Sequence, residues 1–108
     1  MDAAQRLERD VIVTAVTLAE LYRGPRHNQL VDACLSRETG LDVRHTDKPL
    51  AKYVGGVLAA AGAGSEDLPD AHVVAAAVEK GGGVVLTGDE DDLARLAATY
   101  PNVLVQGI

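Results

Sequence analysis

The chain has 108 residues, the length of one small domain, and it is 47% hydrophobic without any Phe or Trp, so we expect a core of Ala, Val and Leu. A net charge of −6 argues against a protein that coats nucleic acid through bulk electrostatics, but not against a nuclease whose carboxylates bind metal. The single cysteine, Cys34, excludes an intrachain disulfide and a cysteine zinc site, and we expect it to be buried. No apolar run approaches the roughly 18 residues that cross a bilayer, and residues 1–10 are too polar for a signal peptide, so a cytoplasmic protein is expected.

The first part of the chain shows helical, strand and helical patterns in turn. Residues 3–9 have a helical composition, and the β-branched run at 11–16 predicts a strand buried on both faces. A capping-box pattern with Thr17 and Glu20 at its ends predicts that a helix begins at this point. The dipeptide Gly24-Pro25 interrupts that helix.

A second helix and a second strand follow. Residues 28–36 predict a helix, and Gly40 is its natural end. Its apolar side chains share one face: Leu30, Val31, Cys34 and Leu35. Residues 41–46 alternate apolar and polar side chains, which indicates a strand near an edge of the sheet.

The second half continues the alternation of helices and strands. Its patterns predict a helix at 49–61, a loop at 62–65, a helix at 69–80, a buried strand at 84–87, a helix at 89–99 and a strand at 103–105. The apolar stripe of the first of these helices predicts a core or dimer surface made of Leu50, Val54, Val57, Leu58 and Ala61. The whole pattern indicates a single α/β domain with a parallel sheet and helices on both faces.

Three acids follow strands or begin helices. They are Glu20, Asp70 and Asp89, and the carboxyl ends of parallel strands, where such residues gather, carry the chemistry of open α/β sheets. Taken singly, each can also be explained as an acid that stabilises a helix N-terminus. Taken together, an oxygen-only cluster suits a hard cation such as Mg²⁺ or Mn²⁺.

Three segments resemble a known family. The runs VTAVTLAELYRG (13–24), LPDAHVVAAA (68–77) and GGGVVLTGDEDDLARLA (81–97) are similar, in order and spacing, to the second, third and fourth acidic motifs of bacterial PIN domains, the family of VapC-type toxins. The resemblance covers nearly the whole chain. It implies a three-layer α/β/α fold built on a parallel sheet.

The resemblance also implies a site and an activity. Glu20, Asp70 and Asp89 would be the metal-site acids, Asp91 a further candidate, and Thr87 a supporting residue at the end of its strand. The implied reaction is hydrolysis of RNA phosphodiesters by a water that Mg²⁺ or Mn²⁺ activates. An antitoxin protein and a second copy of the chain are the implied partners.

Arg23 and Arg26 follow Glu20 closely enough to contact RNA phosphates, although a solvated helix end explains them equally well.

One part of the family pattern is missing. PIN domains of this type begin with a strand that carries an Asp, and nothing before Val11 fits that description. In the family this strand lies in the centre of the sheet, whose strand order is 3-2-1-4-5, so its loss would expose the edges of two buried strands. Neighbouring strands could close the gap, or a second chain could fill it by strand exchange or edge pairing. The third alternative is that sequence before Met1 was lost. With three acids in place of four, weak or absent activity is expected.

Other families fit less well. A phosphatase of the haloacid-dehalogenase type needs an Asp-x-Asp motif after an early strand, and Asp89-Glu90-Asp91 comes too late. A response-regulator receiver fails because its paired acids and lysine are not in place. The alternative that stays open is a non-catalytic PIN-like module that dimerises or binds a partner, with its acids acting as helix caps.

Overall fold

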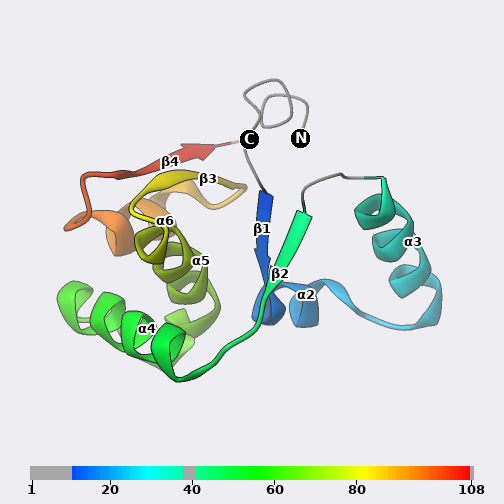
Figure 1. The fold of residues 1–108 in the computed structure, drawn as a ribbon, viewed down its shortest axis with the longest axis horizontal. Coiled ribbons are helices and arrows are strands. Elements are labelled where there is room, and N and C mark those ends of the chain that lie inside the picture. Colours follow the sequence, from blue (N-terminus) through cyan, green and yellow to red (C-terminus); the bar gives the residue numbers. More distant parts are fainter. Residues whose placement is uncertain (1–10, 38–40, 108) are drawn as a thin grey trace. The chain divides into compact units, whose positions relative to one another are not determined.

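The computed structural model describes residues 11–37 and 41–107 of the chain. The chain divides into two compact units, Met1–His45 and Thr46–Ile108, and each has its own parallel strand pair (Figure 1). The predictions for residues 3–9, for Gly40 and for the missing strand before Val11 all lie outside the described residues.

The described residues of the first unit form two strands and two helices. Its elements are β1 (Val11–Thr14), α2 (Ala15–Leu21), α3 (Pro25–Ser36) and β2 (Leu41–Arg44). The two strands pair in parallel, with Val13 opposite Val43. The predicted strand at 41–46 is therefore confirmed, two residues shorter than expected.

The junction of β1 and α2 differs from the prediction. The strand ends at Thr14 and not at residue 16, because Thr14 is the N-cap of α2: its side-chain oxygen accepts a hydrogen bond of 3.1 Å from the Thr17 N–H. The two hydroxyl oxygens also lie 2.8 Å apart. The capping box predicted between Thr17 and Glu20 is therefore wrong, and Thr17 is already inside the helix.

Helix α3 begins earlier than predicted, at Pro25. Gly24 precedes it with φ 129°, a backbone conformation that favours glycine, and the missing N–H of proline does no harm in the first turn of a helix. No residue of α3 is buried, and Cys34 is exposed, so the predicted buried thiol is wrong. The helix is instead fastened by a polar contact: the Tyr22 hydroxyl donates a 2.6 Å hydrogen bond to the Asp32 carboxylate, and this bond raises the pKa of Tyr22.

The second unit follows the predicted order closely. Its elements are α4 (Lys48–Ala61), a 3-10 turn (Ser65–Asp67), α5 (Leu68–Glu79), β3 (Gly83–Thr87), α6 (Glu90–Ala97) and β4 (Val103–Gly107). Each predicted helix and strand is confirmed to within about two residues at either end, and the 3-10 turn was not predicted. Strands β3 and β4 pair in parallel, with Val85 opposite Val105.

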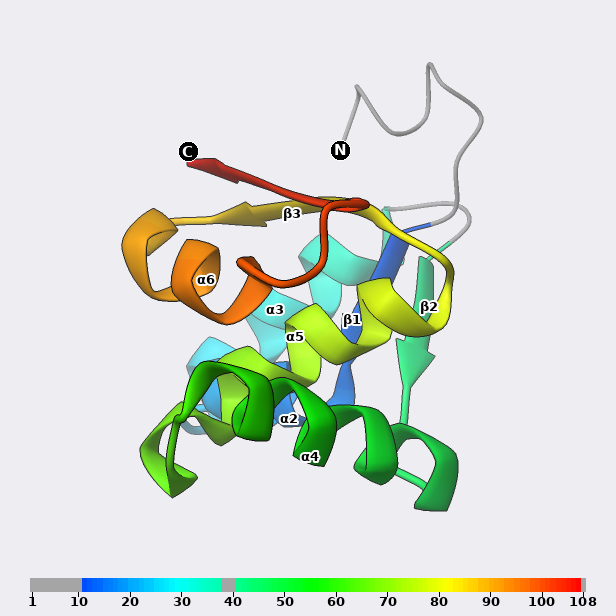
Figure 2. The same cartoon turned by 90° about the vertical axis from the view of Figure 1, so that its left-hand side faces the viewer.

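The core of this unit lies between its helices and one face of its sheet. Helix α4 packs on α5 and α6, which in turn cover β3 and β4 (Figure 2). The residues of the hydrophobic core cluster are all Ala, Val or Leu, as the composition predicted: Leu50, Val54, Val57, Ala71, Val74, Ala75, Val85, Leu93, Leu96, Ala97 and Val103. The predicted stripe on α4 belongs to this core, with Leu58 and Ala61 packed against it.

The helices of the second unit do not cover the other face of its sheet. Val85 is 6% exposed, but its neighbours Val84 and Leu86 are 52% and 55% exposed, and Leu104 on β4 is 60% exposed. The prediction of a buried strand at 84–87 thus holds for one face, because the helices of this unit cover a single side of the strand pair.

Parallel strands connected by helices confirm the α/β class. The described strands form two parallel pairs, β1 with β2 and β3 with β4. In the described part of the chain, no helix has the length and apolar character required to cross a membrane.

Candidate functional site

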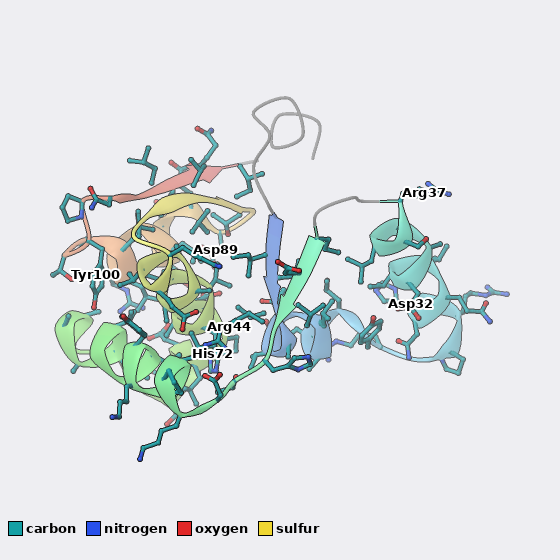
Figure 3. The ribbon with its side chains drawn as sticks, viewed as in Figure 1. Asp32, Arg37, Arg44, His72, Asp89 and Tyr100 are labelled. Carbon is teal, nitrogen blue, oxygen red and sulfur yellow. The ribbon has the colours of Figure 1, made fainter. Side chains whose placement is uncertain are left out.

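Asp89 stands between β3 and α6, where its backbone is fixed and its side chain is exposed (Figure 3). Its N–H donates a 2.9 Å hydrogen bond to the Thr87 hydroxyl at the end of the strand. Although Asp89 occupies the N-cap position of α6, its carboxylate makes no capping hydrogen bond. A capping hydrogen bond therefore does not explain Asp89, and the remaining structural explanation is the favourable position of its charge at the N-terminus of α6.

A second carboxyl lies beside Asp89. Once protonated, Asp92 can donate a hydrogen bond to Asp89, and this bond, followed by the charge of Asp89, raises the pKa of Asp92. Arg95 acts in the opposite direction, but more weakly. Two carboxylates so close together repel one another, and either a proton or a cation relieves the repulsion.

Asp92 was not among the residues predicted from the sequence, whereas Asp91 was. The sequence signal for Asp92 is its spacing of three residues from Asp89 at the start of a helix, because side chains at this spacing lie on the same side. Asp91, two residues after Asp89, is exposed and is not part of the carboxyl pair.

Asp70 lies in the first turn of α5 and is partly buried. The segment just before it is tied to α6 by an ion pair of 3.1 Å between Asp67 and Arg95. This pair connects the start of the Asp70 helix to the helix that begins after Asp89. His72 is buried, and its Nδ1 lies 2.7 Å from the Leu68 carbonyl oxygen.

Glu20 lies in the first unit, near the end of α2, and is exposed. Because Thr14 caps this helix, the carboxylate of Glu20 has no capping function. Its backbone oxygen accepts a 2.6 Å hydrogen bond from the Arg23 Nε. Asp70 and Asp89 belong to the other unit, so the meeting of all three acids stays a prediction.

Within the described residues, no group of three or more His, Cys, Asp or Glu side chains is arranged to hold a metal ion. The predicted RNA contacts Arg23 and Arg26 do lie together, around one open hollow of the first unit.

Comparison with protein families gives one match. Residues 1–99 match the family model of the PIN domain, which is more than nine tenths of the chain. The chain belongs to the PIN-domain family. Comparisons with curated proteins and with solved structures return no match.

PIN domains are generally nucleases that use divalent metal ions. The acids of the second unit fit such an ion in their chemistry, since Asp70, Asp89 and Asp92 offer oxygen donors alone, which Mg²⁺ and Mn²⁺ prefer. The repulsion between Asp89 and Asp92 is a second point of fit, because a bound cation would neutralise both carboxylates.

The raised pKa of Asp92 predicts a pH-dependent effect on stability. The folded PIN domain binds this proton more readily than the unfolded chain does, so the charged form of Asp92 destabilises the fold at neutral pH, and this destabilisation disappears as the pH falls through the raised pKa. We expect Asp92→Asn to raise the melting temperature at pH 7, and the gain to shrink toward pH 4, in melting curves followed by circular dichroism. Asp91→Asn removes an exposed acid of the same turn that forms no ion pair with any described residue, and it should show a smaller change. A lower melting temperature for Asp92→Asn at pH 7 would contradict the repulsion.

Proposed function

We propose that this PIN domain is a Mg²⁺- or Mn²⁺-dependent endoribonuclease of the VapC toxin type, with Glu20, Asp70 and Asp89 as its metal-site acids. The observation that carries the proposal is the carboxylate of Asp89, which leaves the helix uncapped and lies beside a second carboxyl at the end of a parallel strand. Glu20 adds support because its carboxylate is also free of the capping role that would have explained it.

Each residue has a distinct part in the proposed reaction. The bound metal would supply an activated water and neutralise the charge that develops on the phosphate. Thr87 fixes the backbone of Asp89 and so orients its carboxylate. Asp92 can hold a proton against Asp89, and Asp91 is a further candidate for the site. Arg23 and Arg26 would hold the RNA backbone.

The toxin role includes partners. We propose that an antitoxin protein regulates the nuclease and that the chain forms a homodimer, either side by side or with exchanged strands. The exposed apolar face of Val84, Leu86 and Leu104 supports an association of some kind, since such a patch is costly to leave in water.

The same face favours a second candidate function. A non-catalytic PIN-like module would use this surface to dimerise or to bind a partner, and its acids would then have no metal to hold. The two candidates differ in metal binding and in cleavage.

The deciding experiment measures both properties in the intact chain. We expect Mn²⁺ binding by calorimetry and cleavage of RNA in Mg²⁺ or Mn²⁺, with loss of cleavage in a chelator and in Glu20→Gln. The absence of both metal binding and cleavage would favour the non-catalytic module. Cleavage that persists in the chelator would contradict the proposed mechanism.

A further inference from the structure

The turn between α2 and α3 surrounds an open hollow of about 330 Å³. The hollow lies wholly within the first unit, and its lining is basic on one part and apolar on another: Arg23, Gly24, Pro25, Arg26, His27 and Leu30. None of the predicted metal-site acids lines it.

The basic side chains of the hollow are available to a ligand. The Nε of Arg23 donates a hydrogen bond to the Glu20 carbonyl oxygen, and this bond fixes the direction of the guanidinium group. The two terminal nitrogens of Arg23 take no part in that bond. Arg26 and His27 are exposed and form no hydrogen bond or ion pair with the described part of the chain. Two guanidinium groups and an imidazole thus border one concave surface.

The charge around the hollow contrasts with that of the protein. Residues 46–108 carry nine of the sixteen acids against four basic residues, whereas the RGPRH run at 23–27 contains no acid. Of the acids nearest in sequence, Asp32 already accepts the Tyr22 hydroxyl, and Glu20 lies before the hollow on α2. A local positive surface on a chain of net charge −6 concentrates anions at this place.

The type of base and the apolar wall narrow the choice of anion. Arginine presents planar donors that match a phosphate with two hydrogen bonds, which lysine cannot do. Leu30 is 61% exposed beside these groups, and an apolar side chain next to a phosphate contact suits the ribose or base of a nucleotide. A carboxylate matches the same planar donors, so the choice of RNA over an acidic peptide comes from the proposed function, and competition by an acidic peptide is one arm of the test.

We propose that this hollow binds a backbone phosphate of single-stranded RNA, with Arg23, Arg26 and His27 around the phosphate and Leu30 against the adjoining nucleoside. The identification of the ligand as RNA rests on the proposed function. The binding itself needs no metal, so it can be measured apart from cleavage.

The test is binding of a fluorescently labelled single-stranded oligoribonucleotide, followed by anisotropy in EDTA at several salt concentrations. Arg26→Ala should weaken binding roughly fivefold. It should also lower the slope of log affinity against log salt by about 0.7, the loss of one phosphate contact. Arg26→Lys keeps the charge but loses the planar pair of donors, so its affinity for RNA should lie between the affinities of the wild type and of Arg26→Ala. The matched control is Arg37→Ala, which removes the same charge from the opposite end of α3 and should change affinity by less than about twofold (Figure 3).

Several results would overturn the proposal. Equal losses in Arg26→Ala and Arg37→Ala would mean diffuse attraction without a site. If an oligoglutamate of equal charge competes as effectively as unlabelled RNA, the ligand of the hollow is an acidic peptide. If inorganic phosphate binds at the hollow while Arg26→Ala leaves the affinity for RNA unchanged, the hollow is a site for the free phosphate ion.

The outcomes also separate this proposal from the nuclease. Arg26-dependent RNA binding by a chain that never cleaves RNA would leave the hollow established and the nuclease rejected. Metal-dependent cleavage with a KM that Arg26→Ala does not raise would leave the nuclease established and the hollow rejected.

Discussion

The Asp89→Asn variant should lose at least about a hundredfold of metal-dependent RNA cleavage while remaining as stable as the wild type. An amide cannot supply the negative charge of a metal-binding carboxylate, and even residues outside the first coordination shell cost about 10- to 100-fold when they are removed. The fold should survive because the bond to Thr87 comes from the backbone N–H and because no capping bond is lost. Removal of the repulsion with Asp92 acts in the stabilising direction.

Two further variants make this test specific. Asp42→Asn removes the same charge from an exposed position on β2 and should leave kcat/KM within about twofold. Asp91→Asn measures the contribution of the acid that the sequence suggested as an additional candidate. Full activity in Asp89→Asn would show that this carboxylate does not hold the metal. A joint fall of activity and melting temperature would instead point to a structural role.

The second half of the chain could be predicted closely because its signals are local. Asp47 caps α4 through a 3.0 Å hydrogen bond with the Leu50 N–H, proline stands in the first turn of α4 and α5, and glycines follow α5. The residues that bury these helices also lie close in sequence. Local preference and tertiary packing therefore point to the same boundaries.

The first half was harder because two local signals competed. Thr14 and Thr17 can both cap a helix, and the β-branched run at 11–16 favoured the later position. In the structure Thr14 is 3% exposed and caps the helix, so the strand stops two residues early. Because the N-cap is Thr14 and not Thr17, the carboxylate of Glu20 has no capping role. The corrected start of the helix therefore bears on the proposed function of Glu20.

Interactions between side chains were the least predictable. The sequence indicated Asp89 from its place after a strand, but the partnership of Asp89 with Asp92 depends on side-chain direction in the first turn of α6. The exposure of Cys34 likewise depends on what packs against α3, which no local pattern encodes. The positions of Arg23 and Arg26 could be predicted, whereas their common hollow required the turn at Gly24.

The turn that leads into β3 should be intolerant of any side chain. Gly82 has φ 126°, and a Cβ at this position would lie 2.5 Å from the backbone oxygen of Asn102. That oxygen already accepts a 2.9 Å hydrogen bond from the Gly83 N–H, which joins the starts of the two paired strands. A side chain would therefore have to separate β3 from β4 where their pairing begins.

We expect Gly82→Ala to lower the free energy of unfolding by about 3 kcal/mol or more, since backbone strain and overpacking each contribute about 1–3 kcal/mol. Gly81→Ala is the matched control, because Gly81 has φ 87° but open space around it, so strain alone should cost about 1 kcal/mol. Urea denaturation of the three proteins measures the difference. Equal losses at the two positions would mean that Asn102 moves aside freely. A larger loss at Gly82 would show that the close approach of these two strand ends holds the sheet in register, and with it the strand end at which Thr87 fixes Asp89.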